Sequence, residues 1–122
     1  MRNEIKLQFY EPRFIINEET GVVVCKIDYA IHYPDQILNN CRELPIYNTA
    51  RGIARLSEGD SFDLVKGKKI ALTKAERKAY EKVGNFCSRL KNLYFESLRI
   101  CSRFCDKADS VIEHNTDYLD TF

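Results

Sequence analysis

One stretch, TARGIARL at residues 49–56, has the alternating pattern of a β-strand whose two faces differ in character. Ala50, Gly52 and Ala54 fall on one face, and side chains this small let a helix approach the strand closely. Arg51 and Arg55 fall on the other face, four residues apart and so separated by about 13 Å along the strand. The two arginines indicate either a solvated strand edge or an anion-binding site. The second interpretation follows from the geometry of the guanidinium group, whose paired N–H donors match phosphate oxygens.

The residues before this stretch predict further antiparallel strands. Residues 5–10 alternate apolar and polar side chains, which is typical of a half-buried strand. Two β-branched runs, at residues 14–16 and 22–29, flank a short polar loop that ends in glycine and so predict a hairpin. Residues 33–48 hold two prolines and an Asn-Asn pair, so we expect a long loop there. The sequence therefore predicts an antiparallel sheet over residues 1–56.

The hydrophobic period changes from two to about 3.6 in the second half of the chain, which predicts helix. We expect a short helix or turn at residues 57–72 and a long helix at residues 73–114. The boundary rests on a TKAE sequence beginning at Thr73, which has the form of a capping box. A helix that starts earlier, near Phe62 or Lys68, is the alternative.

This helix is long for one domain. About forty residues span roughly 60 Å, whereas a compact chain of this size has a radius of gyration near 14 Å. Gly84-Asn85 is the single internal breaker, so the helix either kinks there or reaches across a second subunit. We expect one α+β domain, residues 1–122, whose N-terminal sheet precedes a long C-terminal helix that forms a dimer interface and ends in an acidic tail at residues 115–122. Beside the apolar residues that set the helical period lies a second apolar stripe at seven-residue steps, which supports a homodimer: Tyr80, Cys87, Tyr94 and Cys101.

The formal net charge of +1 over 122 residues hides an uneven distribution. Residues 1–50 carry −2, residues 51–100 carry +6 and residues 101–122 carry −3. A basic middle flanked by acidic ends indicates an anionic partner, or else a solvated helix surface. No run of about 18 apolar residues and no signal peptide are present, so we expect a cytosolic protein.

Residues that carry catalytic or metal chemistry are few. The five cysteines show no CxxC spacing and only two histidines accompany them, so we expect reduced, packed cysteines and no metal site. The chain has no GxSxG, HExxH, P-loop or GxGxxG motif, so we expect neither an enzyme nor a bound cofactor.

The basic middle is concentrated between residues 66 and 91, where nine lysines and arginines face two glutamates. Such a segment favours a phosphate-bearing ligand, with Tyr80 or Phe86 stacking on its base, while a solvated helix face is the alternative. Opposite the apolar stripe lies a polar row suited to directed hydrogen bonds: Lys78, Asn85, Asn92, Arg99 and Arg103.

Four short stretches downstream of residue 50 follow a common pattern: GIAR at 52–55, GDSFD at 59–63, GKKIA at 67–71 and KA at 74–75. They resemble the GxA(R/K)…(E)DxFD…GxxxA…(R/K)A pattern of the anti-Thoeris sponge proteins of phages. The resemblance covers roughly residues 50–80, and the order of strands followed by a long helix matches across the chain. Gly59 replaces an acidic residue of that pattern, and Lys74 stands where arginine is usual.

The resemblance implies a phage protein that acts in the cytoplasm of the infected bacterial host. Such proteins bind cyclic ADP-ribose isomers, such as glyco-cyclic ADP-ribose, which bacterial TIR-domain enzymes make as alarm signals. They sequester the signal at a dimer interface without cleaving it and so block Thoeris immunity. Some assemble as hexamers, each a trimer of dimers, that also bind the cyclic di- or trinucleotides of CBASS defence.

We therefore expect a site in which cations neutralise a diphosphate, aromatic rings stack on adenine and asparagines contact ribose or base edges. The alternatives are a small dimeric phage regulator that binds nucleic acid, an inhibitor that binds a protein through the apolar stripe, and an enzyme that degrades the same signal. The candidate ligand-binding residues are Arg51, Arg55, Lys74, Arg77, Tyr80, Asn85, Phe86, Asn92 and Arg103.

Overall fold

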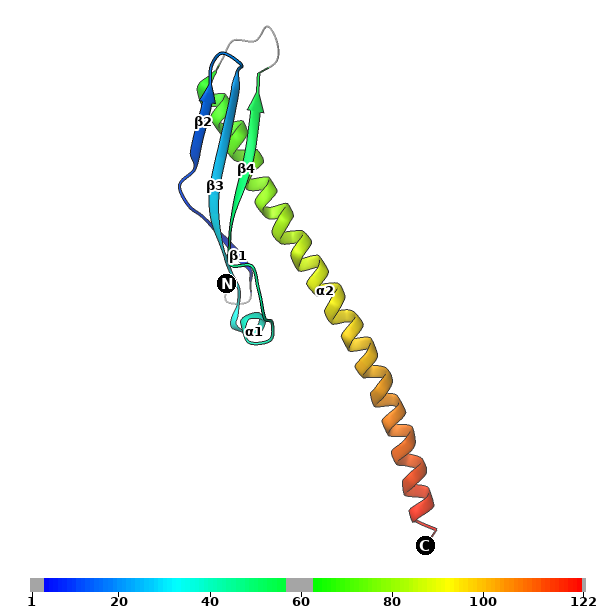
Figure 1. Cartoon of the computed structure of the whole chain (residues 1–122). Coiled ribbons are helices and arrows are strands. Elements are labelled where there is room, and N and C mark those ends of the chain that lie inside the picture. The colour runs from blue at the N-terminus through cyan, green and yellow to red at the C-terminus, as the bar shows by residue number, and fades with distance from the viewer. Residues whose placement is uncertain (1–3, 57–62, 122) are drawn as a thin grey trace. The chain divides into compact units, whose positions relative to one another are not determined.

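The computed structural model describes residues 4–56 and 63–121 and has the expected α+β fold (Figure 1). A four-stranded antiparallel sheet precedes a long C-terminal helix. The chain divides into two compact units, Met1–Lys82 and Val83–Phe122, which we describe separately. Residues 57–62, the first part of the segment expected as a short helix or turn, lie outside the described residues, and so does part of the GDSFD stretch.

The sheet is built around one long central strand. Strand β3 (Val22–His32) pairs along one side with β1 (Lys6–Phe9) and β2 (Arg13–Asn17), each over part of its length. Along its other side it pairs with β4 (Tyr47–Arg55). All three pairings are antiparallel, so the predicted hairpin and the predicted strand around residues 49–56 are both confirmed.

The segment expected as a long loop contains some regular structure. A single helical turn, α1 (Asp35–Leu38), follows Pro34, and β4 begins at Tyr47 rather than at residue 49. The Tyr33 hydroxyl donates a hydrogen bond of 2.6 Å to the carbonyl of Pro45 and so ties the two ends of this connection together. The strand extends further than expected because its first residues pair with β3, which the local sequence does not reveal.

Helix α2 (Leu64–Leu119) begins earlier and ends later than expected. The Asp63 carboxylate accepts a hydrogen bond from the backbone N–H of Lys66 at 3.1 Å, which is the geometry of an N-cap. The expected start at Thr73 is therefore wrong: its hydroxyl donates to the Lys69 carbonyl at 2.8 Å, as threonine does inside a helix. The segment expected as an acidic tail is helical as far as Leu119.

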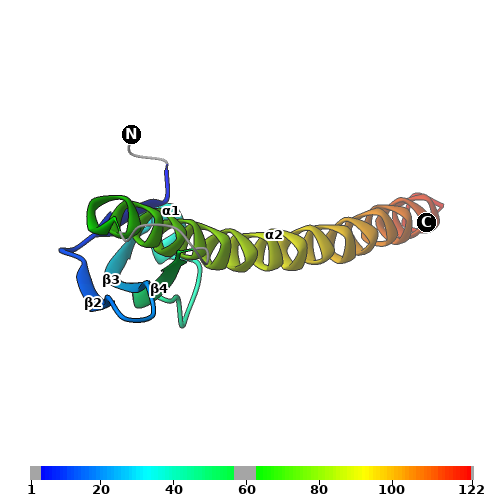
Figure 2. The same cartoon turned by 90° about the horizontal axis from the view of Figure 1, so that it is seen from above.

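The first turns of α2 lie along one face of the sheet (Figure 2). Gly52 of β4 makes this approach so close that an added Cβ would collide with the Ala71 carbonyl and lie 2.5 Å from the Ala75 nitrogen. Ala71 and Ala75 are fully buried, as is Ala79 one turn further along. The close helix approach expected from the small residues of β4 is thus confirmed.

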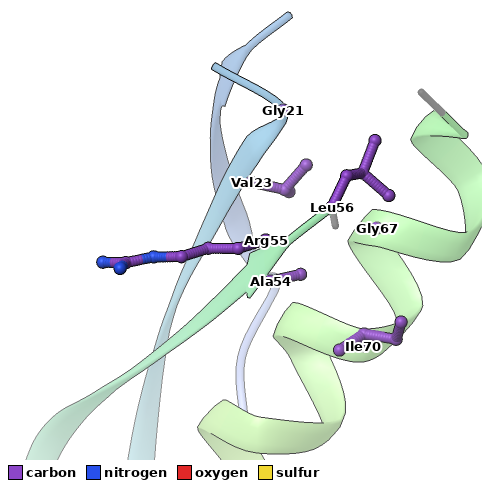
Figure 3. Close-up of a pocket in the computed structure, with 7 residues that line it drawn as sticks. All are labelled: Gly21, Val23, Ala54, Arg55, Leu56, Gly67 and Ile70. Carbon is purple, nitrogen blue, oxygen red and sulfur yellow. The ribbon is translucent and has the colours of Figure 1, made fainter. Parts of the chain in front are cut away.

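The core of the first unit lies between this helix face and the sheet. Alternate residues of β3 point toward α2, and Val23, Cys25 and Tyr29 are among the most completely buried side chains. The other face of the sheet, which we call the outer face, carries the remaining residues of each strand. Arg55 illustrates the division in Figure 3: its side chain points away from α2, while Ala54 points toward the helix.

Candidate functional site

Three cations lie side by side across the outer face of the sheet. The register places Arg13 of β2 opposite Lys26 of β3, and Lys26 opposite Arg51 of β4. Directly opposed residues of antiparallel strands have Cα atoms about 4.5–5.5 Å apart, so their side chains are neighbours. Like charges in such positions repel each other, and an anion bound among them relieves that repulsion.

Arg55 adds a fourth positive charge on the same face. It lies four residues beyond Arg51 on β4 and opposite Val22, and its side chain is exposed. Ile53 separates the two arginines and pairs with Val24, which is 8% exposed. The two arginines therefore share one face across an apolar step, as the alternation of the sequence predicted.

The carboxylate of Asp28 contacts one end of this row, at Arg13. Its Oδ1 accepts hydrogen bonds from the Thr49 hydroxyl at 2.6 Å and from Arg13 Nη2 at 2.9 Å. The Thr49 hydroxyl is the main cause that lowers the pKa of Asp28, with Tyr47 and the Arg13 charge adding to it. Asp28 is therefore ionised at neutral pH and neutralises Arg13 rather than the other cations of the outer face.

Lys74 reaches the same region from the helix side. The backbone N–H of Leu56 donates to the Gly21 carbonyl at 3.1 Å, on the side of the neighbouring strand. Backbone groups alternate in direction along a strand, so those of Ile53, three residues earlier, point away from β3 to the edge of the sheet that β4 forms. Lys74 Nζ donates to the carbonyl oxygen of Ile53 at 3.0 Å. The structure thus brings Lys74 to the stretch of β4 between the two predicted arginines.

We call Lys26, Arg51, Arg55 and Lys74 the cationic cluster. Across residues 4–56 and 63–121, none of these four side chains forms an ion pair with a carboxylate. They come from β3, β4 and α2, so three elements position one concentration of positive charge.

An open hollow of about 280 Å³ on α2 extends from the cluster. It is lined by Lys74, Arg77, Lys78 and Glu81. Arg77 Nε donates to Glu81 Oε1 at 2.9 Å, but both side chains are more than half exposed, and exposed pairs of this kind contribute about 0.3–0.5 kcal/mol. A phosphate can therefore compete for Arg77 at small cost.

A second hollow, shown in Figure 3, is far smaller, at about 20 Å³. It lies where Val23 and Leu56 meet Gly67 and Ile70 of α2, and its lining is mostly apolar. Its size fits a packing gap in the core rather than a ligand site.

Tyr80 is not brought to the cationic cluster. Its ring centroid lies 5.9 Å from that of Phe9 on β1, whereas Lys74 contacts Ile53 on β4. Strands β1 and β4 flank β3 on opposite sides, so Tyr80 and Lys74 point toward opposite edges of the sheet.

The remaining candidates, Asn85, Phe86, Asn92 and Arg103, belong to the second unit. Phe86 is half-buried and the other three are exposed. The helical repeat sets Asn85, Asn92 and Arg103 on one side of α2, as the sequence predicted. Their part in ligand binding stays a prediction.

Sequence reasoning missed Arg13 and Lys26. In the hairpin, the register that pairs Asn17 with Val22 also pairs Arg13 with Lys26. The predicted hairpin could therefore have revealed this pair. The pairing of Lys26 with Arg51 had no such signal, because that register is fixed across the connection between His32 and Tyr47.

Metal and thiol chemistry have little basis in the described residues. In residues 4–56 and 63–121, no three His, Cys, Asp or Glu side chains are placed to hold a metal ion. The cysteines are thiols rather than disulfides, and burial raises the pKa of the Cys25 and Cys87 thiols. In those same residues no helix has the apolar length needed to cross a membrane.

Comparisons of this chain with protein-family models, with curated proteins and with solved structures find no match. The functional argument therefore rests on the chemistry of the cationic cluster and on the sequence pattern around it.

Proposed function

We propose that this protein binds a small phosphate-bearing nucleotide at the cationic cluster and holds it without cleaving it. The observation that carries the proposal is the convergence of four cations, from β3, β4 and α2, that lack carboxylate partners among the described residues. On the resemblance to anti-Thoeris sponge proteins, the ligand is a cyclic ADP-ribose isomer such as glyco-cyclic ADP-ribose. Its capture blocks Thoeris signalling in the cytoplasm of an infected bacterial host.

The geometry suits a diphosphate. Arg51 and Arg55 lie four residues apart on the same face of one strand, about 13 Å along it, and their long side chains can converge so that each guanidinium engages a different phosphate group. The outward backbone N–H groups of β4 add donors along the same edge, as in other anion-binding concavities. Lys74 contributes a point charge at that edge, and Lys26 supports Arg51 from the neighbouring strand.

The chemistry of the cluster favours binding over turnover. Its four side chains are lysines and arginines, which present hydrogen-bond donors and no acceptor. Asp28, a carboxylate on the same face of the sheet as Lys26, has a lowered pKa and is held by Thr49 and Arg13, which makes it a weak base. A rigid strand scaffold also suits slow release, which sequestration requires.

The proposal includes a second subunit. The protein acts as a homodimer that associates through α2, and a hexamer arises as a trimer of such dimers; contacts of Asn85, Phe86, Asn92 and Arg103 with a base or ribose stay a prediction from the sequence. Cyclic di- or trinucleotides, which carry phosphates and purines in a similar arrangement, form the second ligand class.

The direct test is calorimetric titration of the purified protein with cyclic ADP-ribose, its glyco-cyclic isomers and cyclic dinucleotides. We expect binding heat and a raised melting temperature with at least one of them. Arg51→Ala and Arg55→Ala should each weaken binding about tenfold or more, since charge-assisted hydrogen bonds contribute about 1.5–3 kcal/mol. Arg42→Ala is the matched control, because Arg42 is an exposed arginine outside the cluster.

The alternatives give different results. Binding to random duplex DNA that weakens steeply with salt, with no response to cyclic nucleotides, would support a nucleic-acid-binding regulator. A ligand whose mass has changed when heat releases it from the protein would indicate an enzyme. No heat and no melting shift with any isomer would overturn the proposal.

A further inference from the structure

The second unit exposes a wide apolar stripe. From Val83 to Leu119 it is helix, and all of its apolar residues except Phe95 gather within about 160° of the helix circumference. Phe104 is 67% exposed and Leu93 is 63% exposed, although both lie near the middle of the chain segment. The stripe consists of Val83, Phe86, Cys87, Leu90, Leu93, Tyr94, Leu98, Ile100, Cys101, Phe104, Cys105, Ala108, Val111, Ile112, Tyr118 and Leu119.

The spacing within the stripe is that of helices that associate. Steps of four and three alternate from Val83 through Cys87, Leu90 and Tyr94, and they resume from Cys101 through Phe104, Ala108 and Val111. Such a 3–4 repeat keeps one seam facing a partner helix over many turns. An isolated helix in water gains little stability from its own hydrogen bonds. A helix with an exposed apolar stripe of this length therefore needs a partner to remain folded.

Charge along the unit is divided into two halves. Residues 83–103 carry four cations against one acid, while residues 104–121 carry one cation against five acids. A parallel pair of these helices sets basic residues beside basic residues and acidic beside acidic. An antiparallel pair sets each basic half beside an acidic half, which lowers the electrostatic energy.

We propose that the partner is a second copy of this chain, packed antiparallel along the stripe, with the two-fold axis near Arg103. This register sets Cys87 level with Leu119 of the partner subunit and Cys101 level with Cys105 of the partner subunit. Arg89 then lies level with Asp117 of the partner subunit, so the complementary charges flank the apolar seam. The inference does not depend on the proposed ligand, because the protein alone tests it.

The native cysteines allow a cross-linking test of orientation in the full chain. Three variants keep the buried Cys25 and carry Cys41→Ser. The first retains only Cys101 of the helix cysteines, the second retains only Cys87, and the third carries Leu119→Cys with all three helix cysteines changed to serine. Each is treated with a bis-maleimide about 10 Å long, alone and in pairwise mixtures after subunit exchange.

We expect the Cys101 chain to cross-link with itself, since its two thiols lie close to the axis. The Cys87 chain and the Leu119→Cys chain should each stay monomeric on denaturing gels when treated alone, because two Cys87 residues are then ~48 Å apart. Their mixture should cross-link. The cross-link in the mixture also shows that the Cys87 thiol reacts with the maleimide. This control is needed because burial raises the pKa of that thiol.

Sedimentation should give twice the 14.3 kDa chain mass for all three variants. Cross-linking of the Cys87 chain and the Leu119→Cys chain alone, with none between them, would show a parallel pair and overturn the proposal. A monomeric mass with no cross-link in any sample would also overturn it and would point to a different protein as the partner of the stripe.

Discussion

Lys74 Nζ lies 3.0 Å from the carbonyl oxygen of Ile53, so a side chain of α2 closes over the free edge of the sheet. The contact joins the helix to the strand that carries Arg51 and Arg55. It also occupies an outward carbonyl that would otherwise be open to pairing by another strand.

Replacing Lys74 should affect binding more than folding. We expect Lys74→Ala to weaken nucleotide binding about tenfold by calorimetry, because it removes a charge from the cluster. The free energy of unfolding should fall by about 1 kcal/mol or less, since the lost hydrogen bond is exposed. Lys82→Ala, an exposed lysine of the same helix, is the control, and equal binding losses in both variants would contradict a specific role for Lys74.

Lys26 should show opposite effects on stability and on binding. It lies opposite Arg51 with a like charge, and removing such a pair typically stabilises a sheet by about 0.2–1 kcal/mol. We therefore expect Lys26→Gln to raise the urea midpoint slightly while weakening nucleotide binding. A variant that binds as tightly as the unmodified protein would remove Lys26 from the site.

Gly52 should not tolerate any side chain. Its added Cβ would meet the backbone of Ala71 and Ala75, which cannot move aside as a flexible side chain does. We expect Gly52→Ala to lower the free energy of unfolding by about 3 kcal/mol or more, measured by urea denaturation. Gly84→Ala is the matched control: nothing lies within 4 Å of its added Cβ, so helix propensity should stabilise α2 by about 1 kcal/mol.

Asp28 should make stability fall in acid. Because its pKa is lower in the folded protein than in the unfolded chain, its contribution is present above the unfolded value near 4 and is lost as pH falls through the folded value. We expect urea unfolding at pH 6 and pH 3 to show a smaller loss for Asp28→Asn than for the unmodified protein. Equal losses in the two proteins would show that Thr49 and Arg13 do not hold this carboxylate in solution.

Local sequence patterns were sufficient to predict most strands of the first unit and the faces of β4. The alternation of small residues and arginines in β4 predicted both the helix-facing side and the outer side of that strand, and Gly52 marked the close approach. The helix start was misjudged because Thr73 has a capping spacing, while the residue that caps the helix, Asp63, lies in the stretch expected to be a turn.

Contacts between residues far apart in the chain could not be predicted from local sequence patterns. The row of Arg13, Lys26 and Arg51 depends on two strand registers, and one of them is fixed across a long connection. The sequence pattern likewise grouped Tyr80 with Lys74 because they are close along the helix, but the sheet sends them toward opposite edges.

The glycine-to-alanine contact between β4 and α2 has a consequence for motion. Because backbone meets backbone at Gly52, no rotatable side chain lies between strand and helix to absorb a displacement. Strand and helix should therefore move together here, so that the backbone at Lys74 keeps a constant position relative to the strand that carries the arginines. The amides of Gly52 and Ala75 should accordingly be among the slowest to exchange with solvent, since their release requires the first unit to unfold as a whole.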